Sequence, residues 1–497
     1  MRVNQLNDYT IRKEHEMQYQ IYPPIGIARI GNDLNQFYIG PEIPGHPGFE
    51  SDGQTPVQEY KVDEDQIKRQ AARFRIFEIP DANTAPRPIN LPAGATVEWT
   101  VHLVNKKGAV IRGSVPPAQP TRPQPVPNSA DRLIDPKAQT IAGANAAAVK
   151  FDTGEFLNRR VPLGEIRTDQ QQNLLVLGGF GFSSSPNTAP LPDFYTNPGW
   201  HDDVSDGPIT ARIRLSDGTT IANIAPAWVI VAPPDFAPAI QGVVTLYDII
   251  LQVAVDNFGV QPPAHVSFTN HVFPVLQRTR QLRWVNNKPT WSDVSDNWPV
   301  LADTSGAASQ LRTNSADAVR NIESVLSDYS LTSLQKSYLD KWEAGNFLSD
   351  WTGVPQPGNN VTADGLTRAA LDSTVGQGFF PGIEGGILAK DPTLYSTPFD
   401  FRLDHGQAQP GDLTSLMAVP WQADFNDCLR GWWPSQRPDD VRANPNATTT
   451  VRWERGVSSH IGMINNFSRL GFITAQRDAQ GNIVFAEDQR APTIQFV

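Results

Sequence analysis

Short apolar runs interrupted by glycine and proline dominate the first half of the chain, and they predict strands and turns. The pattern is clearest at 21–45, IYPPIGIARIGNDLNQFYIGPEIPG. Alternating positions at 95–111 predict a strand that turns at the polar NKKG and continues as its hairpin partner. Residues 174–186, LLVLGGFGFSSSP, predict a strand and a tight turn, and 225–240, APAWVIVAPPDFAPAI, a buried strand broken by two prolines.

Helical spacing is rarer along the chain. At 62–79, VDEDQIKRQAARFRIFEI, Asp63 suits an N-cap and Ile67, Ala71 and Phe74 recur at helical spacing, so we expect a helix that gives way to a strand. The strongest helical patterns lie at 307–346. Two stretches rich in proline, glycine and polar residues are expected to be loops, namely 113–133 and 354–386.

These patterns predict an α+β fold dominated by β-structure, with several antiparallel sheets and inserted short helices around one extended core. The 43 prolines and 37 glycines keep helices short and connections numerous. We expect three regions: a β-rich domain at 1–235, a helix-containing middle region at 236–375, and a C-terminal region at 376–497.

Charge and composition exclude several classes of partner. The formal net charge is −11, and an acidic surface repels phosphate, so neither nucleic acid nor an anionic membrane is expected to bind. The N-terminal residues lack the apolar core of a signal peptide, which favours a cytoplasmic location and leaves export by another route open. A single cysteine excludes an internal disulfide and a CxxC metal site, and no HExxH motif is present, so no metal site is expected.

That cysteine, Cys428, lies in VPWQADFNDCLRGWWPSQRPDD. Pro420 suits the first turn of a helix and Pro434 would end it. Asp424 and Cys428 are four residues apart, so they would share one helix face. The carboxylate can take the proton of the thiol, but while ionised it raises the thiol pKa, which argues against a thiolate nucleophile. An inert buried cysteine is the alternative.

The same segment resembles a known family. VPWQADFNDC followed by WWPSQRPDDV is similar to the lysine ε-oxidase and glycine oxidase family, whose members carry cysteine tryptophylquinone, a cofactor made from their own side chains. Other blocks resemble the family over most of the chain: PPIGIARIGN, GWHDDVSDGP, WVIVAPPDFAP, FRLDHGQAQPGDLTSLMAVPWQADF and LGFI. The resemblance implies a quinoprotein oxidase that converts a primary amine or amino acid and O2 into an aldehyde or oxo acid, ammonia and hydrogen peroxide.

The resemblance also implies roles for particular residues. Cys428 would supply the sulfur of the cofactor, and Asp424 would act during cross-linking and later as the catalytic base. His460, on the helix face of Phe467, would bind a substrate carboxylate or move a proton, with a structural hydrogen bond as the alternative. Four further residues are candidates for substrate binding: His201, Trp432, Trp433 and Arg442.

His201 is followed by an acidic cluster, Asp202, Asp203 and Asp206, in GWHDDVSDGP. Such a cluster could attract a cationic amine or bind a metal ion, but we favour roles in capping turns. The family resemblance further implies a separate flavoprotein that matures the cofactor, and a homo-oligomer is expected.

One departure from the family pattern concerns the quinone itself. The family's quinone tryptophan lies in a Trp-x-x-Leu-Gly-Phe block, where this chain reads NNFSRLGFI and has Phe467. The partner of Cys428 could instead be Trp453, Trp432 or Trp433; the chain could be a relative that lost the quinone; or Phe467 could have been introduced. The alternative function is therefore that of a cofactor-free or immature member, a binding or scaffold protein or a non-quinone catalyst. A thiol hydrolase built on Cys428 and His460 is disfavoured, because Asp424 opposes thiolate formation.

Overall fold

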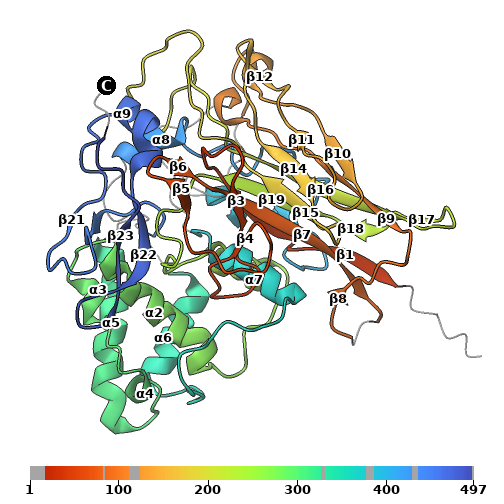
Figure 1. The fold of residues 1–497 in the computed structure, drawn as a ribbon. Helices are drawn as coiled ribbons and strands as arrows, with labels where there is room; N and C mark the ends of the chain where they lie inside the picture. The colour runs from red at the N-terminus through yellow and green to blue at the C-terminus, as the bar shows by residue number, and fades with distance from the viewer. Residues whose placement is uncertain are drawn as a thin grey trace, which may run out of the picture.

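The computed structural model describes residues 17–81, 84–110, 122, 124–325, 331–376, 385–427 and 435–494, with backbone only at 322–325, 386 and 427. The first half of the chain forms a broad sheet, the middle of the chain forms helices beside it, and the C-terminal part packs against both (Figure 1). Cys428, Trp432, Trp433, the N-terminal residues 1–16 and part of the expected loop at 113–133 lie outside the described residues.

Within the described ranges, fifteen strands join one sheet, whose main path runs β10-β9-β16-β19-β2-β7-β15-β14-β11. Its strands are β1 (Gln18–Tyr22), β2 (Ile25–Arg29), β3 (Phe37–Ile39), β4 (Phe49–Glu50), β7 (Arg69–Ile79), β8 (Arg87–Pro88), β9 (Thr96–Val101), β10 (Gln139–Ala142), β11 (Val149–Lys150), β14 (Glu165–Thr168), β15 (Leu174–Leu177), β16 (Ser205–Arg214), β17 (Thr220–Ile221), β18 (Ile224–Ala225) and β19 (Ala227–Ala232).

The predicted strand-rich fold with inserted short helices is confirmed, and most neighbouring strands are antiparallel. The strands gather in a mixed sheet, because β2 pairs with β19, β1 with β18 and β3 with β7 in parallel. The end strand β10 lies beside β11 and β14, so the sheet nearly closes on itself. The smaller pairs are β5 (Lys61–Asp63) with β6 (Gln66–Ile67), β12 (Glu155–Phe156) with β13 (Arg159–Arg160), β20 (Asp440–Val441) with β21 (Val451–Arg452), and β22 (Phe472–Arg477) with β23 (Ile483–Asp488).

The helix expected in the first part of 62–79 is wrong, because that part forms β5, β6 and the start of β7, whereas the strand expected to follow it is confirmed as the rest of β7. β7 pairs with β1, β2, β3, β8 and β15 along its length and is buried on both faces over its first half. A strand covered on both faces carries apolar residues at successive positions and loses the alternation that identifies a strand in sequence. The apolar residues Ile67, Ala71 and Phe74 therefore recur at a spacing that is typical of a helix, although they lie in strands.

The hairpin expected at 95–111 is also wrong, although its first strand is confirmed as β9. β9 pairs with β16 and β10, which lie far along the chain. The NKKG segment forms a 3₁₀ turn, η1 (Lys107–Ala109), in which the Asn105 side chain accepts the Lys107 N–H at 2.9 Å and donates to Asp202 at 3.0 Å. These bonds turn the chain toward the interior of the fold.

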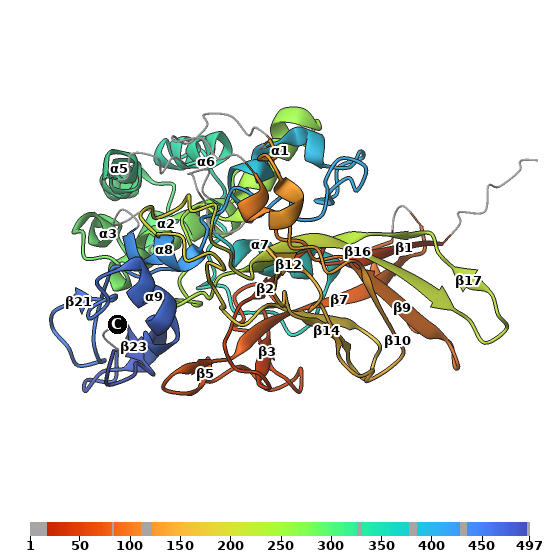
Figure 2. The same ribbon diagram turned by 90° about the horizontal axis from the view of Figure 1, so that it is seen from above.

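Helices lie mainly between 246 and 372, on one side of the sheet (Figure 2). The α-helices are α1 (Leu246–Asn257), α2 (Phe273–Gln281), α3 (Thr290–Asp293), α4 (Trp298–Leu301), α5 (Ser309–Val325), α6 (Ser333–Glu343), α7 (Ala363–Asp372), α8 (Trp421–Asp427) and α9 (His460–Asn466). The pair α5 and α6 confirms the strongest helical pattern. Capping boxes begin α1 at Thr245 and α6 at Thr332.

Helix α7 corrects the expectation of a loop-rich segment at 354–386. Thr362 caps its N-terminus, where its side chain accepts the Gly365 N–H at 3.0 Å. Leu366 and Ala370, one turn apart, are buried, and the helix packs on β2 and β1. Tertiary packing on the sheet therefore fixes a short helix that the surrounding glycines and prolines obscured.

One hydrophobic core joins all parts of the fold. Its largest cluster includes Trp228 of the sheet, Trp291 and Trp342 of the helical region, and Trp453 near the C-terminus. This agrees with the expectation of one extended core, while the expected boundaries near 235 and 375 stay predictions. Throughout the described ranges, every helix is too short or too polar to span a membrane.

Candidate functional site

The candidate site is built around the start of helix α8, and a buried carboxylate fixes that start. Asp202 accepts the backbone N–H of Trp421, the first residue of α8, at 3.0 Å. It also forms an ion pair with Lys107 at 2.5 Å, and both side chains are fully buried. A buried ion pair is tolerated only when further hydrogen bonds satisfy it, and here Asn105 and the helix N–H supply them.

Asp203 holds the turn that follows β15. The backbone N–H groups of Phe180, Gly181 and Phe182 all donate to one of its carboxylate oxygens, at 2.5, 2.8 and 3.2 Å. Burial, and secondarily the neighbouring charge of Asp202, raise the pKa of Asp203 to about 7, although these hydrogen bonds act to lower it.

Asp206 holds the segment that leads into α8. It accepts the backbone and side chain of Thr414, at 2.8 and 2.6 Å, and the indole N–H of Trp228 at 2.9 Å. Burial raises the pKa of Asp206 to about 6. The acidic cluster therefore organises turns and the approach to α8, which supports the structural role that we favoured for it.

A glycine lets the turn at 180–182 approach the site closely. Gly181 has φ of +79°, and the position of a Cβ on it is taken by the ring of Phe467. Gln422 of α8 donates to the Gly181 carbonyl at 2.9 Å and accepts from Ser183 at 2.7 Å. The turn, α8 and Phe467 are thus packed together without intervening space.

Phe467 lies directly against Trp421. The two rings are edge to face, with centroids 5.1 Å apart, and Phe425 also packs edge to face against the indole at 4.8 Å. Trp421 is 1% exposed, and its indole N–H has no hydrogen-bond partner among the residues described. Asp424, one turn further along α8, is 3% exposed. Cys428, expected on the same face one turn later, lies outside the described residues.

Helix α9 positions Phe467 against Trp421. Ser459 caps α9 by accepting the Gly462 N–H at 2.9 Å, and α9 packs on α8. Phe467 follows α9 directly and opens the 3₁₀ turn η8 (Phe467–Arg469). His460 is the first residue of α9, and its Nδ1 lies 3.1 Å from the carbonyl oxygen of Leu191.

The remaining predicted site residues lie in other packing environments. Trp453 is fully buried, donates its indole N–H to the Gly471 carbonyl at 2.9 Å and packs against Phe236 at 4.8 Å. Arg442 lies over the ring of Trp284 at 5.0 Å. Both residues make contacts that are typical of core and surface packing. Among the described residues, neither Trp453 nor Arg442 makes a recorded ring or hydrogen-bond contact with Phe467.

His201 is buried away from solvent. Its Nε2 lies 2.8 Å from the Ser184 hydroxyl, and its ring packs against Phe156. Burial lowers the pKa of His201 to about 4, so the ring is neutral at pH 7. A neutral, hydrogen-bonded ring suits a structural role beside Asp202. No group of three or more potential metal-ligating side chains is found in the parts of the chain that the structure describes.

Sequence reasoning missed several residues that build the site. Lys107, Gly181 and Gln422 were not assigned roles, although the GGFG run was interpreted as a tight turn. Lys107 and its partner Asp202 are 95 residues apart, and Gln422 and its partner Gly181 are 241 residues apart. The charge of Lys107 and the paired glycines were the only local signals.

Comparisons with known proteins agree with this architecture. Residues 22–231 match the family model described as L-lysine epsilon oxidase N-terminal, and residues 310–447 match the L-lysine epsilon oxidase C-terminal domain. The chain is 26% identical to an L-lysine 6-oxidase of Marinomonas mediterranea over 556 residues, covering 88% of this chain and 74% of the relative.

Two solved structures from the same organism share the fold. The L-Lys epsilon-oxidase aligns with a TM-score of 0.76 at 22% identity, covering 95% of this chain and 94% of that one. The Schiff base intermediate of that enzyme with L-Lys aligns with a TM-score of 0.75 at 21% identity, covering 95% of both chains.

Proposed function

Because the chain belongs to the L-lysine epsilon oxidase family, whose N- and C-terminal models together span more than two thirds of it, we propose that it takes a primary amine or a free amino acid as its small-molecule partner. The curated relative is an L-lysine 6-oxidase, and the Schiff base structure shows that its solved counterpart binds L-Lys covalently. The family chemistry is oxidation at a carbon that bears an amino group, with dioxygen as acceptor.

The cofactor implied by the family resemblance does not fit the residue at position 467. Cysteine tryptophylquinone needs an indole beside the cysteine, and Phe467 offers a single phenyl ring without the indole nitrogen. Its position against Trp421 and beside α8 supports its assignment to the family tryptophan position. Trp453, the other candidate among the described residues, donates its indole N–H to the Gly471 carbonyl. We therefore derive no reaction step through a quinone at this site.

The function supported best is that of a cofactor-free family member that binds an amine. The observation that carries it is the phenyl ring of Phe467, 5.1 Å from Trp421, at the position that we assign to the family's quinone tryptophan. Asp424, almost fully buried on α8, is the group that we assign to hold the ammonium of the amine in a charge-assisted hydrogen bond. Aromatic rings beside a carboxylate suit a cation.

A second candidate is the oxidase itself, with a cofactor built from Cys428 and a tryptophan other than residue 467. The burial of Asp424 on the helix that leads to Cys428 favours it, because the expected cross-linking base is retained. In this case the products would be an aldehyde or oxo acid, ammonia and hydrogen peroxide, and a maturing flavoprotein would be required.

Calorimetric titration with L-lysine, glycine and butylamine, together with a peroxide assay, tests the proposal. We expect at least one of the three to bind, with an affinity about tenfold or more weaker in Asp424→Asn, because a hydrogen-bonded charge pair is lost. Asp217→Asn, in the exposed turn after β16, serves as the control. Failure of all three to bind contradicts the proposal, and amine-dependent peroxide favours the second candidate.

A further inference from the structure

A cavity of about 160 Å³ lies among helices α1, α2, α6 and α7, and none of the residues of the candidate site lines it. We call it the helix cavity; Tyr247, Leu251, His271, Arg278, Tyr338 and Arg368 are among its lining residues. A cavity of about 150 Å³ holds a molecule the size of benzene. The helix cavity is therefore large enough for a small organic ligand.

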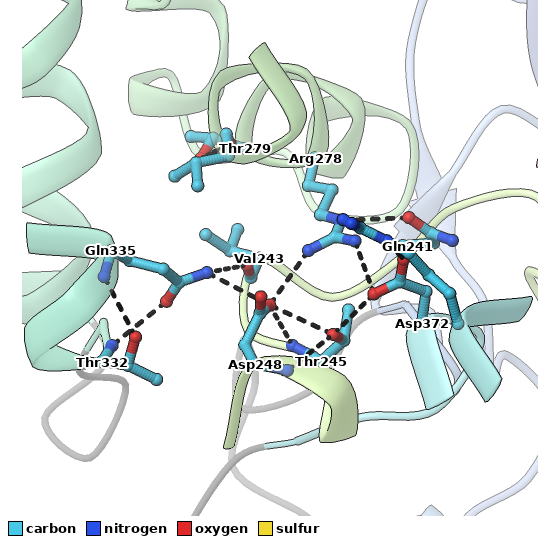
Figure 3. Close-up of polar contacts among 11 residues, drawn as sticks. Gln241, Val243, Thr245, Asp248, Arg278, Thr279, Thr332, Gln335 and Asp372 are labelled. Atoms are coloured by element: carbon cyan, nitrogen blue, oxygen red, sulfur yellow. Dashed lines mark hydrogen bonds and ion pairs between the residues drawn. The ribbon is translucent and has the colours of Figure 1, made fainter. Parts of the chain in front are cut away.

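One end of the helix cavity is held rigid by a buried polar network. Arg278 of α2 reaches between Asp248 of α1, at 3.0 Å, and Asp372 of α7, at 2.9 Å (Figure 3). Its Nε donates to Gln241 at 3.0 Å, and Gln335 of α6 donates to Asp248 at 3.2 Å. Arg278 therefore ties three helices together and has a partner at each of its three nitrogens, so we assign it a structural role.

Arg368 supplies a cation with unused hydrogen-bond donors. Its Nε donates to Asp372 at 2.8 Å, and its guanidinium lies over the ring of Tyr247 at 4.8 Å. That ring stacks in turn on Phe401 at 5.1 Å. The terminal nitrogens of Arg368 make no hydrogen bond to any described residue, and its side chain is 37% exposed. With Arg278, it balances the formal charges of Asp248 and Asp372.

Two further donors line the helix cavity. His271 lies on a π-helical turn (Phe268–Val272), a rare geometry that often marks functional sites. The Ser267 N–H donates to His271 Nδ1 at 2.8 Å, which places the proton of the neutral ring on Nε2. Its ring packs on Tyr338 at 4.8 Å. Neither His271 Nε2 nor the Tyr338 hydroxyl has a hydrogen-bond partner in the described part of the chain.

The rest of the lining combines the polar side chains of Gln261 and Asn270 with apolar residues, Leu251, Val255, Pro262, Val275 and Leu334 among them. A pocket with apolar walls and a few convergent polar groups is the usual form of a small-molecule site. Here the unused polar atoms of Arg368, Tyr338 and His271 are donors. An arginine with free terminal nitrogens is well suited to a carboxylate.

We propose that the helix cavity binds a small organic carboxylate with an apolar body, whose carboxylate meets Arg368 and Tyr338 and whose body lies against Leu251. A free amino acid and an oxo acid share this chemistry. This site is separate from the amine site around Asp424, and its ligand does not need an amino group.

Titration of the full-length protein with 4-methyl-2-oxopentanoate, L-leucine and 3-methylbutan-1-amine tests the proposal. The first two carry the carboxylate and share the apolar body, and the amine lacks the carboxylate. We expect the oxo acid and L-leucine to bind, and the amine to bind at least tenfold more weakly at this cavity. Asp424→Asn should leave binding of the oxo acid unchanged, which separates this site from the amine site.

Three cavity variants locate the binding. Arg368→Gln should weaken binding of the oxo acid by about tenfold or more, and Tyr338→Phe by about threefold to tenfold, because each removes a donor to a charged group. Leu251→Trp should abolish it by filling the cavity. Arg320→Gln is the matched control, since Arg320 is 39% exposed and ion-paired on α5. The Tyr338 hydroxyl has no hydrogen-bond partner among the described residues, so Tyr338→Phe leaves no polar group unpaired and should fold normally. Absence of carboxylate binding, or equal affinity in all three variants, would overturn the proposal.

Discussion

The ring of Phe467 meets the indole of Trp421 edge to face at 5.1 Å, and this contact joins α9 to α8 at the candidate site. Phe467 is the residue that the family resemblance assigns to the position of the quinone tryptophan. The Gly181 turn packs against Phe467, and Trp421 is the first residue of α8.

Restoring tryptophan should restore the cross-link. Phe467→Trp, coexpressed with a maturing flavoprotein of the family, is expected to yield a thioether between Cys428 and residue 467, with amine-dependent peroxide. The added ring must fit beside Gly181, and overpacking of this kind costs about 1–3 kcal/mol of stability. Peptide mass spectrometry detects the link, and Phe467→Trp with Cys428→Ser is the control. A correctly folded Phe467→Trp protein without the link would count against the assignment of position 467.

Gly181→Ala should destabilise the fold more than its φ alone explains. Gly218 has a similar φ of +89° with no atom within 4 Å of the added Cβ, whereas at Gly181 the Cβ would meet Phe467. We expect Gly218→Ala to cost about 1 kcal/mol and Gly181→Ala about 1–3 kcal/mol more, through overpacking. Denaturant unfolding measures both. Equal costs would mean that the turn can move away from Phe467.

Stability should depend on the protonation of Asp203. Its folded pKa of about 7 lies above the unfolded value, so its protonated form stabilises the fold below about pH 4. That contribution is lost as pH rises toward 7, at up to about 1.4 kcal/mol per pH unit. His201, with its pKa lowered to about 4, acts in the opposite direction between about pH 4 and 6.5.

Asp203→Asn, which stays neutral, isolates the effect of Asp203. The difference in unfolding free energy between Asp203→Asn and the wild type should shift in favour of the variant as pH rises from 4 to 7. Asp217→Asn, at an exposed turn, should show no change over this window. A pH-independent difference for Asp203→Asn would show that Asp203 is ionised throughout.

Removing Lys107 should be costly because it leaves Asp202 buried without its cation. Lys107→Met is expected to lose about 3–5 kcal/mol of stability. Adding Asp202→Asn removes the charge while keeping an oxygen that can accept the Trp421 N–H, so the double variant should recover part of the loss. Urea unfolding of the single and double variants checks this. A loss below about 1 kcal/mol for Lys107→Met would contradict the role of the ion pair.

The sequence predicted the buried strand β19, the helices α5 and α6 and the structural role of the acidic cluster from local patterns. It failed at β7, where burial on both faces erased the alternation that marks a strand, and at α7, where packing on the sheet stabilises a short helix.

The site was predictable only in part. The roles of Asp424 and Phe467 follow from resemblance to family blocks and stay predictions. The burial of Asp424 on α8 and the contact of Phe467 with Trp421 are seen only in the structure. The contacts of Lys107 with Asp202, and of Gln422 with Gly181, join residues far apart in the chain, so no local pattern reveals them. Trp453 was a candidate because of its residue type; it is buried and donates its indole N–H to the Gly471 carbonyl, and its role as the partner of Cys428 stays a prediction.

The most direct test is the chemical state of Cys428 in the purified wild-type protein. Proteolysis and mass spectrometry of the peptide that contains Cys428 would show whether it is joined to another peptide. Our account predicts an unlinked peptide with a free thiol, because residue 467 is phenylalanine. A Cys428 peptide linked to a tryptophan peptide with added oxygen would contradict it and would identify the true partner of the quinone.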